Sequence, residues 1–269
     1  MQTDHYALAK EAFLDVVDPA NYIQIDRVST LYEGLKKSLE KPLKLVLLYG
    51  KPGTGKSMML GRLYEELRLT MPVHLVPTPL IEEEEFLRHV YTFLLGKAAP
   101  DSFGFATLID ALEAVEFPVT PIILLDEAQL YEAPLMEKIR LIADTRKAKF
   151  LITLHKTEKE DIIAKEHFQT RIWESIQLHN ASKQELQIYI QKKLLKHSLF
   201  VLANQFTKKH THTIHRFTQG NYRDTNKLLY TLFDIYSHYL AQAPTKISTQ
   251  KLSTKLIEMA GLATGLIHD

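Results

Sequence analysis

A short glycine-rich segment, GKPGTGKS at residues 50–57, follows directly after the apolar run KLVLLY at residues 44–49. The apolar run predicts a buried strand, and the residues after Lys56 have the spacing of an amphipathic helix. Gly50, Gly53 and Gly55 permit a tight turn, because a residue without a Cβ can adopt positive φ and approach other groups closely. This segment therefore requires a fold in which a strand, a tight loop and a helix follow one another.

The segment also matches the pattern G-x-x-x-x-G-K-[ST], which binds phosphate groups through backbone N–H donors and the positive end of the following helix. In this pattern the Lys56 ammonium would contact the β- and γ-phosphates, and the Ser57 hydroxyl would bind Mg²⁺. We therefore predict a nucleotide site. Its predicted residues are Gly50, Lys51, Pro52, Gly53, Thr54, Gly55, Lys56, Ser57 and Met58.

Composition narrows the class of protein. The chain has 269 residues, which is enough for one large or two modest domains. Its 33 basic and 32 acidic residues give a net charge of +1, so binding to a nucleic acid would need a local basic patch. It has no cysteine, which excludes disulfides and thiolate chemistry and suits a reducing cytoplasm. We expect neither a signal peptide nor a membrane span.

Short apolar runs alternate with longer amphipathic segments over the first 180 residues, which predicts an α/β domain with a mainly parallel sheet at residues 1–180. After residue 180 the strand signals stop, and the remaining segments predict an all-helical domain at residues 181–269. The expected strands are 44–49, 73–77, 121–126, 149–154 and 175–178. The expected helices between them are 57–69, 82–95, 105–115 and 134–144.

A second chemical signal is PIILLDEAQ at residues 121–129, a predicted buried strand that ends in two carboxylates. A phosphate-loop site needs one carboxylate at a strand end for the magnesium ion and, for hydrolysis, a base that orients the attacking water. We assign the first role to Asp126 and the second to Glu127. The pair therefore predicts a hydrolase site as well as a binding site.

Together, GKPGTGKS, IILLDEAQ and the helical C-terminal region resemble the AAA+ ATPases. This resemblance implies ATP and Mg²⁺ as ligands, a five-stranded parallel sheet in the order 5-1-4-3-2, a helical lid and an oligomer that completes each site. The stretch DEAQLYEAPLMEKIRLIADT (126–145) is similar to secretion and pilus-assembly ATPases of the GspA/ExeA and MshM type. The lid segment QFTKKHTHTIHRFTQGNYRDTNKLL (205–229) is also similar, so the resemblance covers about residues 26–239.

The resemblance implies roles for further residues. A polar sensor at the end of the fourth strand would be Thr153 or His155, although TLHKTE departs from the sequence usual in the secretion ATPases. Arg171, in FQTRIWESIQL, would be the arginine finger that reaches a neighbouring subunit, with Arg140 as a weaker candidate. Arg223, in GNYRDTNKLL, would be the second sensor, which couples the γ-phosphate to the angle of the lid.

The segment KKHTHTIHR at residues 208–216 contains His210, His212 and His215. No carboxylate pattern accompanies these histidines, so a basic lid face is favoured over a metal site. Its Lys208, Lys209 and Arg216 would contact either nucleic acid or only solvent.

The resemblance favours an accessory ATPase for secretion or pilus assembly, cytoplasmic or peripheral at the inner membrane, which would need a partner protein to reach the membrane. One alternative is a DNA-associated AAA+ ATPase of the transposition-regulator or origin-recognition type. The near-neutral charge and the lack of a recognisable DNA-reading module weigh against this alternative. Another is a nucleotide-gated binding module with little turnover, against which the presence of Glu127 argues.

Overall fold

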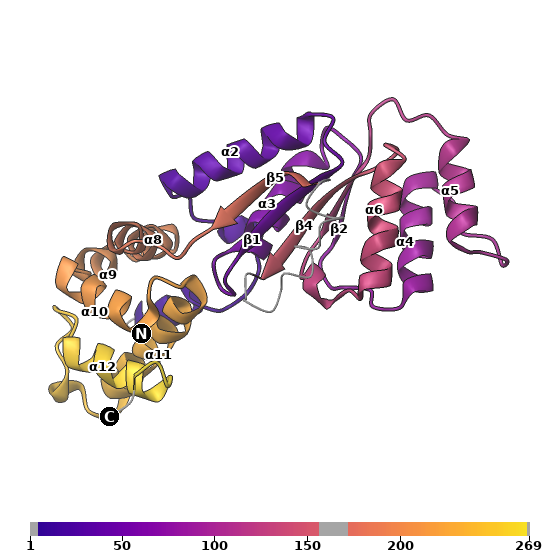
Figure 1. The fold of residues 1–269 in the computed structure, drawn as a ribbon. Coiled ribbons are helices and arrows are strands. Elements are labelled where there is room, and N and C mark those ends of the chain that lie inside the picture. Colours follow the sequence, from indigo (N-terminus) through magenta and orange to yellow (C-terminus); the bar gives the residue numbers. More distant parts are fainter. Residues whose placement is uncertain (1–4, 156–171, 268–269) are drawn as a thin grey trace. The chain divides into compact units, whose positions relative to one another are not determined.

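The computed structural model describes residues 5–155 and 172–267 (Figure 1). The chain forms two compact units. One, the α/β unit, is Val28–Leu178. The other, the helical unit, combines Met1–Arg27 with His179–Asp269. No helix in the described ranges is both long enough and apolar enough to cross a bilayer.

The α/β unit contains a five-stranded sheet in the order β2-β3-β4-β1-β5, and all of its strand pairs are parallel. This is the order 5-1-4-3-2 that the resemblance to the AAA+ ATPases implied, read from the opposite edge, so that prediction is confirmed. The strands are β1 (Leu45–Gly50), β2 (Val73–Val76), β3 (Ile122–Leu125), β4 (Lys149–His155) and β5 (Ile172–Leu178).

Helices cover both faces of this sheet (Figure 1). The helices are α2 (Asp26–Glu40), α3 (Lys56–Leu67), α4 (Glu83–Leu95), α5 (Phe105–Glu113) and α6 (Ala133–Asp144). Leucines and methionine of α2 and α3 pack with Val46 and Leu48 of β1 in one apolar cluster. Residues of α4, α5 and α6 pack with Phe150 and Ile152 of β4 in a second cluster. Burial on both faces explains why the central strands read as continuous apolar runs.

The register of the strands brings distant segments to one edge of the sheet. In the β1–β4 pair Gly50 lies opposite His155, and in the β3–β4 pair Leu125 lies opposite Ile152. Because the strands are parallel, the loop after β1 and the residues after β3 emerge at the same end as Thr153 and His155. Ligands of open α/β sheets bind at this carboxyl end of the strands.

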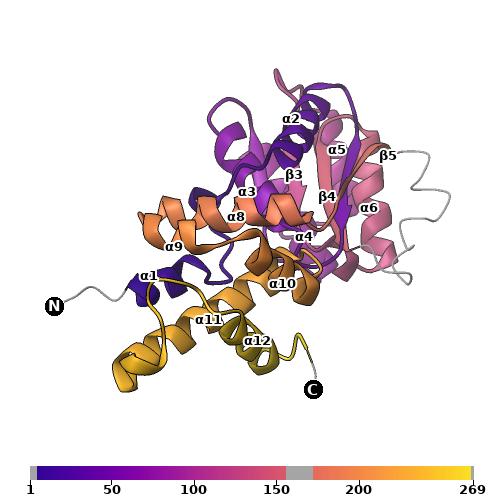
Figure 2. The same ribbon diagram turned by 90° about the vertical axis from the view of Figure 1, so that its left-hand side faces the viewer.

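The helical unit consists of α1 (His5–Ala12), α8 (Lys183–Lys196), α9 (Phe200–Gln205), α10 (Lys208–Thr218), α11 (Tyr222–Gln242) and α12 (Thr254–Ala263). The first of these helices packs on α11 (Figure 2), where the Tyr6 ring stacks on Tyr236 at 4.7 Å and the Phe13 ring lies 5.8 Å from Phe233. The structure thus groups residues 1–27 with the C-terminal helices, whereas the boundary expected from the sequence placed them with the α/β domain.

Gly220 joins α10 to α11 in a conformation that only glycine fits. Its φ is +75°, and a Cβ at this position would lie 2.0 Å from the carbonyl oxygen of Ala181. The Ala181 N–H also donates to the Gly220 carbonyl at 2.9 Å. The segment before α8 is therefore held directly against the α10–α11 turn.

A lysine lies inside the helical unit. Lys193 of α8 is 8% exposed, and its ammonium donates to the Tyr189 hydroxyl and to Asn226 Oδ1, both at 3.1 Å. It also lies 5.1 Å from the centre of the Phe13 ring. Burial lowers the pKa of Lys193 to about 8, and the nearby Asp15 opposes the shift only in part. At neutral pH the folded protein therefore holds a charged group that would be better solvated in the unfolded chain.

Replacing Lys193 with methionine is expected to change how stability depends on pH. Between the folded pKa of about 8 and the ordinary lysine pKa of 10.5 the unfolded chain binds more protons, so the wild type gains stability as pH rises through this window. The gain is about 3 kcal/mol, and Lys193→Met should not show it. Urea unfolding of both proteins at pH 7, 8.5 and 10, followed by circular dichroism, measures the difference. Parallel pH profiles would contradict this account.

Candidate nucleotide-binding site

The loop after β1 has the backbone conformation that the glycine pattern predicts. Gly53 and Gly55 have φ of +76° and +93°, and Gly55 is the residue that precedes the first turn of α3. A Cβ at Gly50 would lie 2.5 Å from the carbonyl oxygen of Leu178, so this glycine permits the close approach of β5. The Thr54 hydroxyl closes the loop by donating to the Lys51 carbonyl at 2.8 Å.

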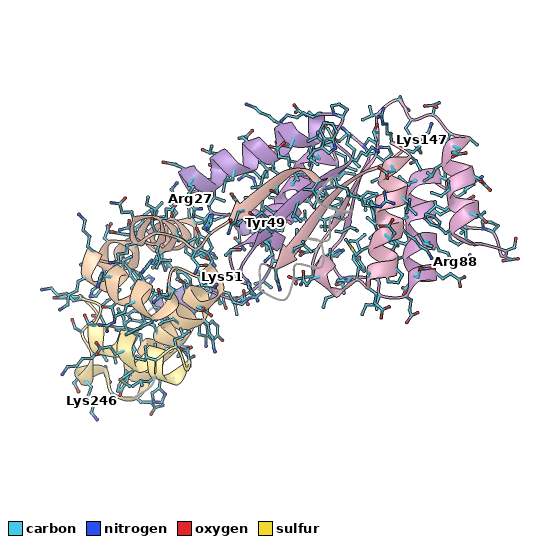
Figure 3. All side chains as sticks on the ribbon, viewed as in Figure 1. Arg27, Tyr49, Lys51, Arg88, Lys147 and Lys246 are labelled. Carbon is cyan, nitrogen blue, oxygen red and sulfur yellow. The ribbon has the colours of Figure 1, made fainter. Side chains whose placement is uncertain are left out.

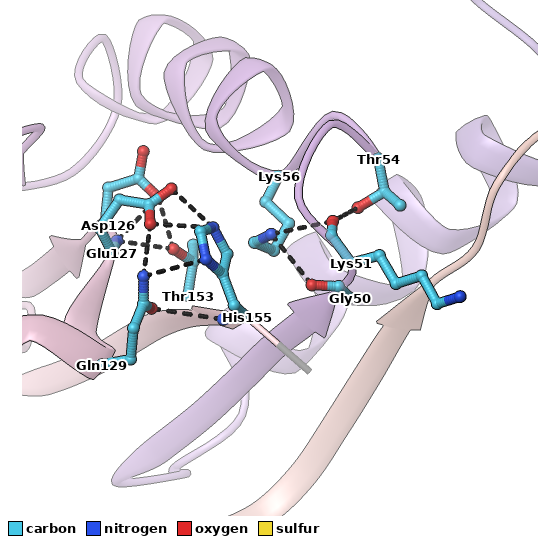
Figure 4. Close-up of polar contacts among 9 residues, drawn as sticks. All are labelled: Gly50, Lys51, Thr54, Lys56, Asp126, Glu127, Gln129, Thr153 and His155. Carbon is cyan, nitrogen blue, oxygen red and sulfur yellow. Dashed lines mark hydrogen bonds and ion pairs between the residues drawn. The ribbon is translucent and has the colours of Figure 1, made fainter. Parts of the chain in front are cut away.

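Lys56 is only 4% exposed although it carries an ammonium group. Its Nζ donates to the carbonyl oxygens of Gly50 at 3.1 Å and Lys51 at 3.2 Å, which holds the charge against the loop (Figure 4). The Lys51 side chain instead extends away from this centre, and it is exposed. Ser57 and Met58, half-buried, follow in the first turn of α3.

Asp126 follows β3 and is 6% exposed. Its Oδ1 accepts hydrogen bonds from the Glu127 N–H at 3.0 Å and from the hydroxyl of the fully buried Thr153. The Glu127 N–H also lies 3.0 Å from the Thr153 hydroxyl oxygen. Of the two sensor candidates, Thr153 therefore fixes the position of Asp126.

His155, the other candidate, contacts Glu127 instead. Its Nε2 lies 3.0 Å from Glu127 Oε1, and the side-chain amide of Gln129 donates to the other carboxylate oxygen. The same amide nitrogen lies 3.3 Å from His155 Nδ1, so in this geometry Nδ1 accepts and the Nε2–H donates to Glu127. The Gln129 oxygen accepts from the His155 backbone N–H at 3.3 Å.

Gln129 thus connects Glu127 with His155, and sequence reasoning did not assign it a role. Its position two residues after Glu127 was visible in DEAQ, but the contact depends on two local features. Glu127 adopts φ of +51°, in the left-handed region, and a 3-10 helix at Ala128–Leu130 then turns Gln129 back toward β4. These features bring the amide into the site.

The residues present fit a magnesium ion. Mg²⁺ in phosphate-binding enzymes keeps several waters and takes one or two protein oxygens together with substrate phosphates. The Ser57 hydroxyl and the Asp126 carboxylate supply such a donor set. Among the described residues no group of three or more histidine, cysteine or acidic side chains is placed to hold a metal ion.

The predicted arginines lie in different surroundings. Arg140 is 9% exposed and is engaged by Glu137 and Asp144 of its own helix, which raise the pKa of the guanidinium. A role in a neighbouring subunit would require both ion pairs to break. Arg223, at the start of α11 in the helical unit, pairs with Asp15 at 3.2 Å, and both side chains are more than half exposed. Arg171 lies outside the described residues.

The helical unit carries a separate hollow of about 750 Å³, which the sequence did not reveal. It is lined by the start of α2, by the segment before α8 with the first turns of that helix, and by the residue after α10, and it includes Arg27, Asn180 and Glu185. Arg27 Nε donates to Glu185 at 2.7 Å, so one wall is fixed by an ion pair. The Nδ2 of Asn180 donates to the Gln219 carbonyl at 2.9 Å.

Comparisons with known proteins agree with this geometry. Residues 40–161 match the AAA domain family. No curated protein sequence matches the chain significantly. Three solved structures resemble the fold. Cdc6p from Pyrobaculum aerophilum is similar with a TM-score of 0.64 at 14% identity, covering 85% of this chain and 66% of that one.

The Aeropyrum pernix Orc2 protein, solved in ADPNP and ADP complexes, is similar with a TM-score of 0.62 at 14% identity, covering 94% and 71%. The Aeropyrum pernix Orc1 protein, solved in complex with DNA, is similar with a TM-score of 0.58 at 15% identity, covering 94% and 69%. At these identities the similarity establishes the fold. The chain therefore contains a region matching the AAA domain family and has the AAA+ P-loop fold with a helical C-terminal region.

Proposed function

We propose that this chain binds ATP with Mg²⁺ and hydrolyses it to ADP and phosphate. The observation that carries the proposal is the meeting of two segments at one end of the sheet. The phosphate loop with the buried Lys56 follows β1, and the Asp126–Glu127 pair follows β3 next to Thr153 and His155.

Each residue has a role in this proposal. Backbone N–H groups of the loop and the Lys56 ammonium bind the phosphates and offset their charge. Ser57 and Asp126 would hold Mg²⁺, which when bound neutralises charge on the phosphate oxygens. Glu127 orients the attacking water and accepts its proton, with His155 and Gln129 setting the position of the carboxylate.

Two arginines extend the proposal to an assembly. Arg171 would act as a finger on the nucleotide of a neighbouring copy, where a positive charge stabilises the transition state. Arg223 would respond to the γ-phosphate, after leaving its exposed pair with Asp15. The protein would then work as an ATP-dependent homo-oligomer.

For the biological class, we favour an ATPase that acts together with DNA. The support is the similarity to the Aeropyrum pernix Orc1 protein, which was solved on DNA. An accessory role in secretion or pilus assembly is the second candidate, and the similarity of the segment 126–145 to those ATPases supports it. A nucleotide-gated module with little turnover is the third.

Phosphate release from ATP, measured with and without duplex DNA over a range of salt concentrations, tests these readings together. We expect a basal rate that DNA increases, with the increase falling steeply as salt rises, because phosphate contacts release counterions. ATP binding with no phosphate release would favour the gated module. If DNA leaves the rate of ATP turnover unchanged at every salt concentration, the accessory role in secretion or pilus assembly would be favoured over the DNA-associated role.

A further inference from the structure

The helix α10 differs from the other helices in how its charge is arranged. Its sequence KKHTHTIHRFT contains Lys208, Lys209 and Arg216 and no acidic residue. Lys208, His212 and Arg216 follow one another at intervals of four residues, which places them along one side of the helix. With Lys209 next to them, all four side chains are exposed. We call these four residues the α10 stripe.

The opposite side of α10 faces the core of the helical unit. Ile214 is fully buried and Phe217 is 8% exposed. His210 is also buried and caps the start of the helix, with its Nδ1 3.1 Å from the Gln205 carbonyl oxygen. His215 contacts the Ala181 carbonyl at 3.2 Å. The packing of these residues fixes which side of α10 faces solvent, so the stripe is presented by a rigid element.

Within the described ranges the cations of the α10 stripe make no ion pair, whereas many other cations of this protein do. Arg68 pairs with Glu65, Arg88 with Glu84, and Lys10 with Asp234. The Arg216 guanidinium lies only over the neighbouring Phe217 ring, at 5.0 Å. The positive charge of the stripe is therefore available to a partner.

The position of two of these charges is also unfavourable for the helix itself. The positive end of the helix dipole lies at the N-terminus, so cations in the first turn of a helix are unfavourable. Lys208 and Lys209 are the first two residues of α10, whereas α4 begins with Glu83, Glu84 and Glu85. A bound polyanion would offset this repulsion. Binding therefore accounts for two exposed lysines at the start of α10, which the packing of the helix does not explain.

We infer that the α10 stripe binds the phosphate backbone of DNA, an inference that rests on the proposed DNA-associated function. The stripe from Lys208 to Arg216 spans about 12 Å at 1.5 Å per residue. Measured along the DNA axis, where each strand carries one phosphate per about 3.4 Å, that length corresponds to three to four nucleotides. Contacts of this kind are independent of base sequence, so the stripe holds the protein on DNA without selecting a site.

The same positive charge would also attract an anionic membrane, but the stripe lacks what a membrane helix needs. Interfacial helices insert a row of large apolar side chains among the acyl chains. The apolar side chains of α10 are buried in the helical unit, and none of its large hydrophobic residues is among the exposed ones of the described chain. DNA therefore fits the stripe better than a lipid surface.

The test compares two triple variants that remove the same charge. One is Lys208→Ala with Lys209→Ala and Arg216→Ala. The other, the control, is Lys246→Ala with Lys251→Ala and Lys255→Ala, three exposed lysines of the same unit, of which Figure 3 labels Lys246. Fluorescence anisotropy with a labelled duplex of random sequence gives the affinity at several salt concentrations.

We expect the stripe variant to bind DNA at least about tenfold more weakly at low salt, and its slope of log affinity against log salt to fall by about 2.7. The control variant should keep most of the affinity and of the slope. Basal ATP turnover should stay unchanged in both variants, because neither set includes a residue assigned to the nucleotide site. The melting temperature of the stripe variant should not fall, because removing two cations from the first turn of α10 relieves their repulsion by the helix dipole. If the triple variant does not fold, the single variants replace it, and each should lower the slope by about 1.

The outcomes separate the two proposals. DNA binding by the stripe variant equal to that of the wild type would overturn the inference and leave the DNA-associated function standing. A wild type that does not bind DNA would overturn both. A third arm uses vesicles with phosphatidylglycerol, and if these bind the wild type more tightly than DNA and lose binding in the stripe variant, the partner is an anionic membrane and the inference is wrong.

Discussion

Lys56→Ala is expected to weaken ATP binding by roughly 10²–10⁴-fold, because hydrogen bonds to charged groups contribute about 1.5–3 kcal/mol each and the ammonium would contact two phosphates. The structure adds a second reason. The same ammonium donates to the carbonyl oxygens of Gly50 and Lys51, so its removal also loosens the loop that presents the backbone donors. Isothermal titration with Mg-ATP measures the loss directly.

Two further variants test whether the lost affinity comes from the lost charge of Lys56 or from the lost bulk of a side chain in the loop. Lys56→Met keeps most of the buried volume without the charge, and it should lose nearly as much affinity as the alanine variant. Lys51→Ala removes an exposed side chain whose backbone carbonyl stays in place, so ATP affinity should change little. If Lys56→Ala binds ATP with an affinity within a few-fold of the wild type, the loop after β1 is not the phosphate-binding loop and the assignment of the site fails.

Glu127→Gln is expected to retain ATP binding while slowing turnover by about 10²–10⁴-fold, the usual contribution of a positioned general base. The amide keeps the size of the side chain and still offers one oxygen to the Nε2–H of His155, which lies 3.0 Å from the carboxylate. It cannot accept a proton from water. Single-turnover measurements of phosphate release, together with a binding titration, distinguish lost chemistry from lost binding.

Gln129→Ala serves as the matched control for this variant. It leaves the Glu127 carboxylate intact but removes the amide that connects Glu127 with His155. We expect a smaller fall in kcat than in Glu127→Gln, with KM unchanged, because only the orientation of the base is affected. If Glu127→Gln turns over at the wild-type rate, another group orients the water and the assignment fails.

The sheet could be predicted well from the sequence, for a physical reason. Its central strands are buried on both faces, so each appears as a continuous apolar run bounded by polar residues. The β3 strand, Ile122–Leu125, is four consecutive apolar residues, all of them buried. The phosphate loop was equally visible, because glycine is the residue that adopts positive φ most readily, as Gly53 and Gly55 do here.

Other features depend on contacts that no local pattern records. The sequence predicts helices throughout residues 181–269, but it does not place the break between α8 and α9, where Ser198 adopts φ of +60°. Gln129 faces His155 only because Glu127 adopts a left-handed conformation, which is uncommon for a residue other than glycine. Nothing in the first 27 residues signals that their partner is α11.

Because α1 packs on α11, which is synthesised much later, the order of synthesis affects how the helical unit folds. The salt bridge between Lys10 and Asp234 joins residues 224 positions apart, and the Tyr6 and Phe13 rings find their stacking partners on the same late helix. At about 5–20 residues per second, roughly ten to forty seconds separate the emergence of the two helices from the ribosome. The α/β unit has all its residues by Leu178 and can fold during this interval. During this interval the aromatic side of α1 lacks its partner helix, and it stays exposed to solvent until α11 (Tyr222–Gln242) has been synthesised.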